Sequence, residues 1–598
     1  MTHLENFLKS DYSTLDNLKL DFSFSQIGEQ NEPKLCSALS NCVNLTKLNI
    51  YLSSTQFSNK FLSNLGYSLS CLSNLTDLTL DLQETNMNDD VASEFLLNLL
   101  KKEKLRSLTL YLSDNYITEI ASSAIAQLIS SCSSLIQLKI FLNFNEIKSE
   151  GLISISQSLE NCTHLETLNI SIGENNISSN GLKQLASSLV KCLNLKDLNL
   201  NISFNNIDDE GGSYLLYNLI KCKKLNNLKL NLNKNKLSDL KAQHQEEKEE
   251  IQTSLCNAYI QVDSNQINPV GVQNLLKSLE RFQNVETLSL SLNQNKLLIK
   301  EKNIGLLTAL SSLNKLGKLY ISLIENQIHE EGLFELIQVT SNCKSLKEFH
   351  LYLSKNNLGQ QEAKILGFYL STCRIIENVE FSLSQNKFDD NEFQEFGNSI
   401  AQNDSIKSLQ IYLEQCTIGN LGIGSLSKGL GHLINLTHLN LNLIENCVDS
   451  QGAYNLGFGL TYCFNLQNLT LWLSANKIGS NGVFNLTQQL GKCSNLRTLQ
   501  LSLANCNIGS EGAHNLGVNL LSCKNLIQLD LLLGSNNIYD EGVNNILNLF
   551  KHQKLILLSL NLQDNGITPQ AQNQIQKKGF KMKKLTIFQV YFSYCYFK

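Results

Sequence analysis

The sequence is poor in proline, tryptophan and charged residues. Its 598 residues include three prolines and one tryptophan, and 17% of them are charged. Average usage is about 5% proline and about 25% charged residues, so roughly 30 prolines would be expected at this length. Linkers between domains tend to be rich in proline, glycine or polar residues, and no such stretch is visible. The composition therefore argues against the roughly three to five domains that the length alone would suggest.

The sequence also lacks a strong charge bias and a long apolar run. The net charge is −5, whereas nucleic-acid-binding domains usually present a strongly basic face. The N-terminal segment MTHLENFLKS has no apolar core of a secretory signal. No run approaches the roughly 18 apolar residues that a membrane-spanning helix needs. We therefore expect no nucleic-acid partner, no secretory signal and no membrane span.

One 30-residue pattern repeats through almost the whole chain. With x for any residue, it reads L-x-x-L-x-L-x-L-x-x-N-x-I-x-x-x-G-x-x-x-L-x-x-x-L-x-x-C-x-x. The intervals are all 30 residues except one of 31 and one of 29, which leaves no room for an inserted domain. The repeats start at Leu15, Leu45, Leu75, Leu105, Leu135, Leu165, Leu195, Leu225, Leu255, Val285, Leu316, Leu346, Ile376, Ile406, Leu436, Leu466, Leu496, Leu526, Leu555 and Leu585.

Each repeat is predicted to form a strand, a turn and a helix. The leading leucines have a period of two, which is typical of a strand with one buried face. Leucines four residues apart, such as Leu185 and Leu189, follow the repeat glycine and indicate an apolar helix face. The very polar stretch 238–254 keeps the 30-residue phase. We therefore interpret it as the helical part of one repeat with a polar outer face, and not as a linker.

At these positions the chain resembles leucine-rich repeat proteins, and its helical second half and glycine resemble the ribonuclease-inhibitor-like subclass. Its composition is similar to that of multi-repeat proteins predicted from ciliate and other protist genomes. The resemblance implies an α/β leucine-rich repeat solenoid (a horseshoe) of about 20 strand-turn-helix repeats. Its parallel sheet would form the concave face and its helices the convex face. We expect an N-terminal cap over residues 1–14, the repeat array over 15–584, and a C-terminal edge strand or basic-aromatic cap over 585–598.

Asparagine occupies the eleventh position of 14 of the 19 complete repeats. A short amide supplies a donor and an acceptor, and the buried main-chain groups of a tight turn need both. We expect the stacked amides to form a ladder that holds the turns. Cys416 and Cys506 take this position in two repeats, and Ser25, Thr55 and Thr85 take it in the first three. These residues pair the turn less well, so the first three repeats are predicted to be the least stable.

Ten of the 17 cysteines share one repeat position, three residues before the repeat start. Such a column indicates packing, because free cysteine behaves as a small, buried hydrophobe. No C-x-x-C pair suggests zinc, the histidines have no metal spacing, and the glycine-rich segment 419–425 lacks a phosphate-loop pattern. We therefore predict no metal, no cofactor and no enzymatic activity, and a reducing, cytoplasmic location. The ten cysteines are Cys42, Cys132, Cys162, Cys192, Cys222, Cys343, Cys373, Cys463, Cys493 and Cys523.

One column of strand residues is predicted to face the concave space and to carry the partner-binding residues. Its middle part is small and neutral, with serine, asparagine and glutamine, whereas aromatic residues gather toward both ends. Aromatic side chains are enriched at interaction hot spots, although tyrosine and tryptophan also simply suit strands. The candidate partner-binding residues are Tyr51, Tyr111, Phe141, Tyr352, Tyr412 and Trp472.

The pattern favours a non-catalytic scaffold that binds a protein partner on its concave face, with its oligomeric state left open. One alternative is a regulator of a small GTPase, because the Ran GTPase-activating proteins resemble this architecture. That family carries an acidic segment after its repeats, whereas this chain ends in a basic, aromatic tail. Another alternative is a leucine-rich repeat sensor or adaptor, which would need a further domain. The tail itself is a cap, a partner-binding segment or an artefact of gene prediction.

Overall fold

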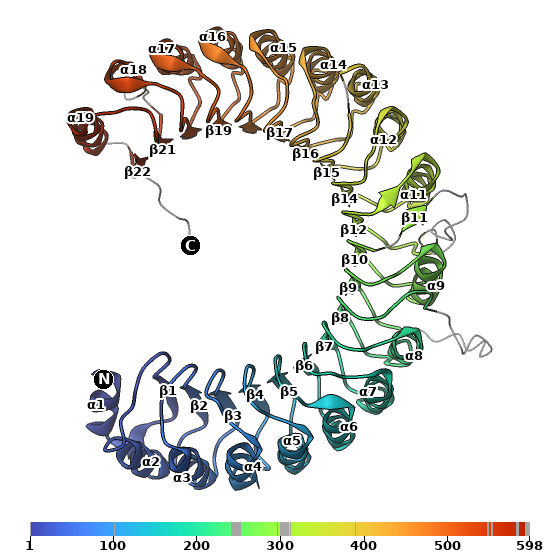
Figure 1. Ribbon diagram of the computed structural model, residues 1–598, viewed down its shortest axis with the longest axis vertical. Coiled ribbons are helices and arrows are strands. Elements are labelled where there is room, and N and C mark those ends of the chain that lie inside the picture. Colours follow the sequence, from blue (N-terminus) through green and yellow to red (C-terminus); the bar gives the residue numbers. More distant parts are fainter. Residues whose placement is uncertain are drawn as a thin grey trace. The chain divides into compact units, whose positions relative to one another are not determined.

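The chain divides into two compact units. The computed structural model describes residues 2–100, 102–240, 253–295, 297–299, 310, 312–388, 390–546, 549, 551, 554–581 and 585–592. Unit 1 comprises Met1–Lys296 and Thr308–Leu316, and unit 2 comprises Leu297–Leu307 and Gly317–Lys598. In both units short strands alternate with helices along the chain (Figure 1).

In the described part of unit 1, ten parallel strands pair side by side, each one repeat after the last. A strand residue lies opposite the residue 30 positions later, as Leu48 does with Leu78. The strands are β1 (Asn17–Asp21), β2 (Lys47–Tyr51), β3 (Asp77–Asp81), β4 (Ser107–Tyr111), β5 (Gln137–Phe141), β6 (Thr167–Ser171), β7 (Asp197–Asn201), β8 (Asn227–Asn231), β9 (Asn257–Gln261) and β10 (Thr287–Ser291). The helices are α1 (Thr2–Leu8), α2 (Glu32–Ser40), α3 (Asn59–Ser70), α4 (Asp89–Asn98), α5 (Glu119–Ser131), α6 (Lys148–Leu159), α7 (Ser179–Lys191), α8 (Asp209–Leu219) and α9 (Pro269–Leu279), with a 3-10 turn at Tyr12–Thr14.

Unit 2 repeats the same arrangement over its described residues. Its main strands are β12 (Lys318–Ser322), β14 (Glu348–Tyr352), β15 (Asn378–Ser382), β16 (Ser408–Tyr412), β17 (His438–Asn442), β18 (Asn468–Trp472), β19 (Thr498–Ser502), β20 (Gln528–Leu532), β21 (Leu557–Asn561) and β22 (Ile587–Tyr591). Two short strands, β11 (Leu298–Ile299) and β13 (Gln327–Ile328), pair separately. The helices are α11 (Glu330–Asn342), α12 (Gln360–Thr372), α13 (Asp390–Ile400), α14 (Asn420–Leu430), α15 (Ser450–Leu460), α16 (Gly479–Leu490), α17 (Gly509–Asn519), α18 (Tyr539–Ile546) and α19 (Pro569–Phe580), with a 3-10 turn at Leu520–Ser522.

The period-two leucines form the core between strands and helices. In β2, Leu48 and Ile50 are buried while Tyr51 is half-buried on the opposite face. Main-chain bonding continues past the strand, since Leu52 N–H donates to Asp81 O at 2.8 Å. Within each unit the strands lie on the inner side and the helices on the outer side (Figure 1). The predicted α/β leucine-rich repeat solenoid, with strand, turn and helix in each repeat, is confirmed.

The asparagine column holds the turns by joining each repeat to the one before it. Asn205 donates through Nδ2 to Ile172 O at 3.0 Å, in the preceding repeat, and to Ile202 O at 3.2 Å in its own. Its Oδ1 accepts from the main-chain N–H of Asn175 at 3.1 Å and of Ile177 at 2.9 Å. The stacked amides therefore pair the main-chain groups of the turns, as predicted, and each one also bonds to the preceding repeat.

The cysteine column is a packing feature, as the sequence predicted. All ten cysteines are buried and free. Burial raises the pKa of Cys192 to about 12. In one repeat Lys102 takes the cysteine's place, three residues before Leu105, and it is buried too. Its ammonium donates to Leu69 O and Leu72 O, each at 2.7 Å, and burial lowers its pKa to about 8.

The two ends of the chain carry an amphipathic helix and a last strand. Leu4 and Phe7 of α1 are buried. At the other end β22 pairs with β21 in parallel, and its Phe588 ring packs against Phe580. Of the polar stretch 238–254, residues 241–252 lie outside the described residues. None of the helices that the structure describes is both long and apolar enough to cross a bilayer.

Candidate functional site

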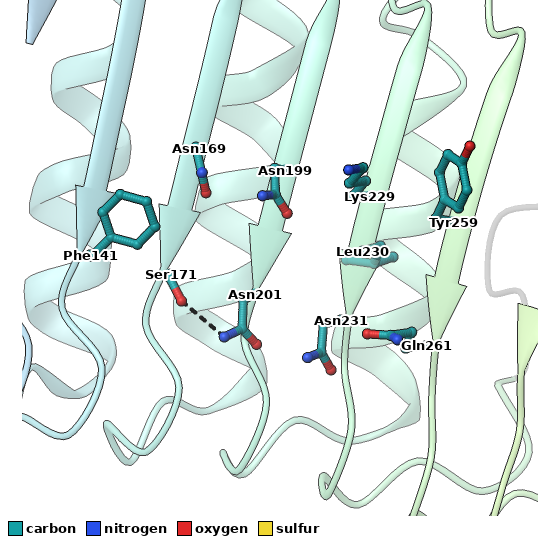
Figure 2. A pocket seen from close by; sticks show the side chains of 10 residues that line it. All are labelled: Phe141, Asn169, Ser171, Asn199, Asn201, Lys229, Leu230, Asn231, Tyr259 and Gln261. Atoms are coloured by element: carbon teal, nitrogen blue, oxygen red, sulfur yellow. Dashed lines mark hydrogen bonds between the residues drawn. The ribbon is translucent and has the colours of Figure 1, made fainter. Parts of the chain in front are cut away.

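The inner face of unit 1 is hollowed over five consecutive strands, β5 to β9. We call this concavity the amide hollow; its volume is about 530 Å³. It forms here because side chains alternate along a strand, and most inner-face positions of these strands hold small or medium polar residues. Figure 2 shows the residues that line it, which are Phe141, Asn169, Ser171, Asn199, Asn201, Lys229, Leu230, Asn231, Tyr259 and Gln261.

The amides in the hollow differ in how firmly they are held. Asn201 donates to Ser171 Oγ at 2.9 Å and accepts from the main-chain N–H of Ser203 at 3.1 Å (Figure 2). The side chains of Asn169, Asn199 and Gln261, in contrast, make no hydrogen bond with any other residue that the structure describes. Each of these three offers two N–H donors and one carbonyl acceptor to a ligand.

Aromatic rings border the amide hollow on both sides. Phe141 stacks on Tyr111 with ring centroids 4.6 Å apart and planes 8° apart. At the other edge Lys229 Nζ lies 5.7 Å from the ring centroid of Tyr259. A ring on each side of a polar floor gives the hollow apolar contact area as well as hydrogen-bonding groups.

A second hollow of about 460 Å³ adjoins the first and shares Asn169, Asn199, Lys229 and Tyr259 with it. It extends toward the start of the strands, where a lateral row of hydrogen bonds crosses β7, β8 and β9. In that row Asn257 Nδ2 donates to Asn227 Oδ1 at 2.7 Å, and Asn227 donates in turn to Asp197. The two hollows together form one continuous polar surface that carries little net charge.

The inner face of unit 2 has a different character, because carboxylates and rings cluster on it. His350 lies between two glutamates, with Nδ1 2.9 Å from Glu380 Oε2 and Nε2 3.3 Å from Glu348 Oε1. The Tyr320 ring packs on the His350 ring at 4.6 Å. Lys318 Nζ lies 2.9 Å from the other oxygen of Glu348. The cluster is therefore a compact network that spans β12, β14 and β15.

The environment of this network shifts the pKa of one glutamate and of two tyrosines. Burial acts to raise the pKa of Glu348, but hydrogen bonds from Tyr320 and Lys318 hold it below its usual range. Burial, reinforced by the Glu380 carboxylate, raises the pKa of Tyr352 and of Tyr412. Both tyrosines therefore stay protonated at neutral pH and remain hydrogen-bond donors on the inner face.

The six aromatic residues predicted to bind a partner lie on inner-face strands and are all half-buried. Tyr51, Tyr111 and Phe141 belong to unit 1, and Tyr352, Tyr412 and Trp472 to unit 2. The structure brings Tyr111 and Phe141 into direct contact and places Phe141 at the edge of the amide hollow. Their role in binding remains a prediction.

Sequence reasoning missed most of the amide hollow. Asn199, Lys229 and Tyr259 occupy a strand column next to that of the aromatic candidates, and all three are exposed. Asn169 shares that column, and Gln261 lies in the column of the aromatic candidates, among its small, neutral residues. The signal was present as amides in two adjacent outward columns over neighbouring repeats.

The titratable and thiol groups of the described residues show no arrangement for metal binding. Among these residues no group of three or more His, Cys, Asp and Glu side chains is placed to hold an ion. The column cysteines are buried, and burial raises the pKa of Cys162 to about 12. Metal ligation and nucleophilic attack both need the thiolate, so these thiols serve as packing groups.

Comparison with known proteins finds similarity among solved structures. No model of a known protein family matches the chain. No curated protein matches it. Among solved structures, the crystal structure of an internalin (inlF) from Listeria monocytogenes is similar, with a TM-score of 0.32 and 14% sequence identity. The similarity covers 84% of this chain and 94% of that chain. A likeness of this degree has no bearing on what the chain binds.

Proposed function

We propose that the chain is a non-catalytic scaffold that binds a protein partner on the inner face of its repeats. The observation that carries this proposal is the amide hollow, in which Asn169, Asn199 and Gln261 present hydrogen-bonding groups that no described residue uses. A peptide group offers one donor and one acceptor, so a group of unpaired amides can form hydrogen bonds with the exposed main chain of a partner. The bordering rings of Phe141 and Tyr259 add the kind of contact that dominates protein interfaces.

The aromatic residues of unit 2 extend this proposal to a second inner-face area. Tyr352 and Tyr412 keep their hydroxyl protons and are half-buried on the inner face. Trp472 lies on the inner-face side of β18. We propose that they contact the same partner or a second one. A partially exposed aromatic side chain with a polar tip is a common anchor at protein interfaces.

Two further properties belong to the same proposal. Each repeat whose second half the structure describes contains a helix there. This supports the ribonuclease-inhibitor-like subclass. The free, buried cysteine column supports a reducing, cytoplasmic location, because structural disulfides are rare there.

Affinity purification with mass spectrometry tests the proposal. We compare wild type with an amide variant, Asn199→Ser with Gln261→Ser, and with an aromatic variant, Tyr352→Ser with Tyr412→Ser and Trp472→Ser. The control is Asn481→Ser with Gln488→Ser, which removes two exposed amides from α16 on the outer face. We expect partners that the control retains to be lost from at least one inner-face variant. Identical partner sets for all four proteins contradict inner-face binding.

A further inference from the structure

The outer face of unit 2 carries a groove between α14 and α15 of about 560 Å³. It exists because α14 presents little side chain there. Gly424 and Gly431 leave the floor open, and a wall is formed by Phe458 of α15 and by Tyr462, two residues after the end of that helix. The remaining lining residues are Lys428, His432, Asn455 and Gly459. The volume lies in the range of about 300–1,000 Å³ that is typical of ligand sites.

A row of exposed aromatic rings runs along the groove. Tyr454 and Phe458 are four residues apart and share one face of α15, and Tyr462 follows just after the end of the helix. Their ring centroids are 6.0 and 5.4 Å apart in this order. Phe464 continues the row at 6.5 Å from Tyr462. Phe458 is 45% exposed and Phe464 is 66% exposed. A contiguous exposed apolar patch of this kind marks an interaction site more often than a single exposed residue does.

The geometry of the row suits a helix. Rows of side chains four residues apart form the ridges that pack into the grooves of a neighbouring helix. The groove runs beside such a ridge, with a glycine floor that lets apolar side chains enter. Helix-in-groove recognition uses apolar anchors at the same spacing, which would lie against Phe458 and Tyr462.

The charge around the groove indicates which charge the polar face of a bound helix carries. Helices α14, α15 and α16 contain no aspartate or glutamate. Lys428 and His432 line the groove, and Lys492 follows α16 one repeat further on. The Lys428 ammonium forms no ion pair with any residue that the structure describes. Complementary charge across an interface favours the matching partner and excludes the wrong one.

We propose that this groove is a docking site for an amphipathic helix of another protein, with apolar residues on one side and acidic residues beside them. The site is separate from the inner face and does not depend on the function proposed above. The apolar side of the helix packs between Phe458 and the glycine floor, while its carboxylates pair with Lys428.

Three synthetic 18-residue peptides test the proposal by fluorescence anisotropy with the full chain. One has leucines on one helix face and glutamates on the other, the second has lysines in place of the glutamates, and the third is the glutamate peptide with two central prolines. We expect only the glutamate helix to bind well. Phe458→Ser should weaken it by about tenfold or more, as expected for a hot-spot residue. Gly424→Leu, which fills the groove, should act likewise.

The charge reversal Lys428→Glu gives a result that misfolding cannot mimic, because it should shift the preference toward the lysine helix. Phe368→Ser removes an even more exposed ring, 57% against 45% for Phe458, from α12 and should leave binding unchanged. The inner-face variant Asn199→Ser with Gln261→Ser should bind the peptide as wild type does, which separates this site from the proposed function.

Several outcomes would overturn the proposal. Equal binding of the three peptides, or an unaffected Phe458→Ser variant, would show that the groove selects neither a helix nor a charge. Self-association of the wild type that Phe458→Ser abolishes, measured by sedimentation, would assign the groove to a second copy of the chain. Binding to phosphatidylcholine–phosphatidylserine vesicles that Phe458→Ser abolishes would assign it to a lipid surface.

Discussion

The side-chain oxygen of Asn205 accepts a hydrogen bond from the main-chain N–H of Ile177, 28 residues earlier, at 2.9 Å. The two residues belong to consecutive repeats, so one amide completes the turn of its predecessor. Buried main-chain groups are costly when unpaired. The column of asparagines is therefore a set of cross-links between neighbours, repeated along each unit.

The substitution Asn205→Ala should destabilise the repeats on both sides of it. It removes the acceptor of Ile177 N–H and the donor to Ile172 O, and a buried unpaired group costs about 1–3 kcal/mol, so we expect a loss of about 2–4 kcal/mol. Urea unfolding and hydrogen exchange over Ile172–Ile207 measure it. Asn206→Ala, one residue away and exposed, is the matched control. An equal loss in both variants would rule out the cross-link as the cause.

The first repeats should gain stability from the amide that they lack. The Thr55 hydroxyl donates to Phe22 O at 2.7 Å. Its side chain is too short also to accept from a main-chain N–H of the preceding repeat, as Asn205 Oδ1 does. Thr55→Asn is expected to add about 1 kcal/mol, the usual net value of one hydrogen bond. Slower hydrogen exchange over residues 22–55 would support this prediction. Unchanged exchange would also count against the expectation that the first three repeats are the least stable.

Lys102 should make stability rise with pH over an unusual range. Its pKa is lowered from 10.5 to about 8 by burial, so between these values the unfolded chain holds a proton that the folded chain has released. Stability therefore increases as pH rises from about 8 to about 10.5, and the charged form is penalised below pH 8. Hydrogen exchange over α4 and β4 at several pH values, corrected for intrinsic exchange, measures this. Lys102→Leu, which places here the residue that the preceding repeat has at this position (Leu72), should abolish the dependence; if it persists, another group is responsible.

The sequence was sufficient to predict the features that recur in every repeat and insufficient for those that occur once. Strands, helices, the asparagine column and the cysteine column follow from a phase that twenty repeats reinforce. Lys102 stood among other lysines, so nothing in its surroundings marked it as the occupant of a buried position. Asn169 and Asn199 are the same residue type as the asparagines that hold the turns, so the sequence does not distinguish the two groups. Only the structure distinguishes an amide that bonds to main chain from one that makes no hydrogen bond with any residue the structure describes.

Two glycines set a close approach between α13 and α14. A Cβ at Gly429 would lie 2.1 Å from the carbonyl oxygen of Gly397, and a Cβ at Gly397 would lie 2.4 Å from the nitrogen of Leu426. Gly429→Ala must separate the helices, so we expect a loss of about 1–3 kcal/mol, typical of overpacking. At Gly424 the added Cβ meets only the flexible Asn455 side chain, and Gly424→Ala should stabilise by about 0.5–1 kcal/mol through helix propensity. Urea unfolding of both variants compares the signs, and two equal signs would contradict the close approach.

The tenth position of the repeat adopts a left-handed backbone without using glycine. Phe144, for example, has φ 56° and is 55% exposed, so its ring contributes little to the core. A left-handed residue with a Cβ is strained by about 1–2 kcal/mol, so Phe144→Gly should stabilise by up to about 1 kcal/mol after the greater chain entropy of glycine is counted. Phe144→Val, which is branched at Cβ, should destabilise. Thermal unfolding of both variants distinguishes the two causes. Backbone strain predicts opposite changes in stability, whereas loss of the ring would change the stability of both variants in the same direction.

Because each asparagine amide completes a turn of the preceding repeat, the turns are completed in the order in which the repeats are synthesised. During synthesis the newest repeat to leave the ribosome lacks the amide that completes its turn until about thirty more residues have been added. Folding would then advance one repeat behind translation, and a chain cut short at its C-terminal end would always expose one unfinished turn. A chain shortened from its N-terminal end would keep the later amide of each remaining turn, except where another residue, such as Cys416 or Cys506, replaces the asparagine.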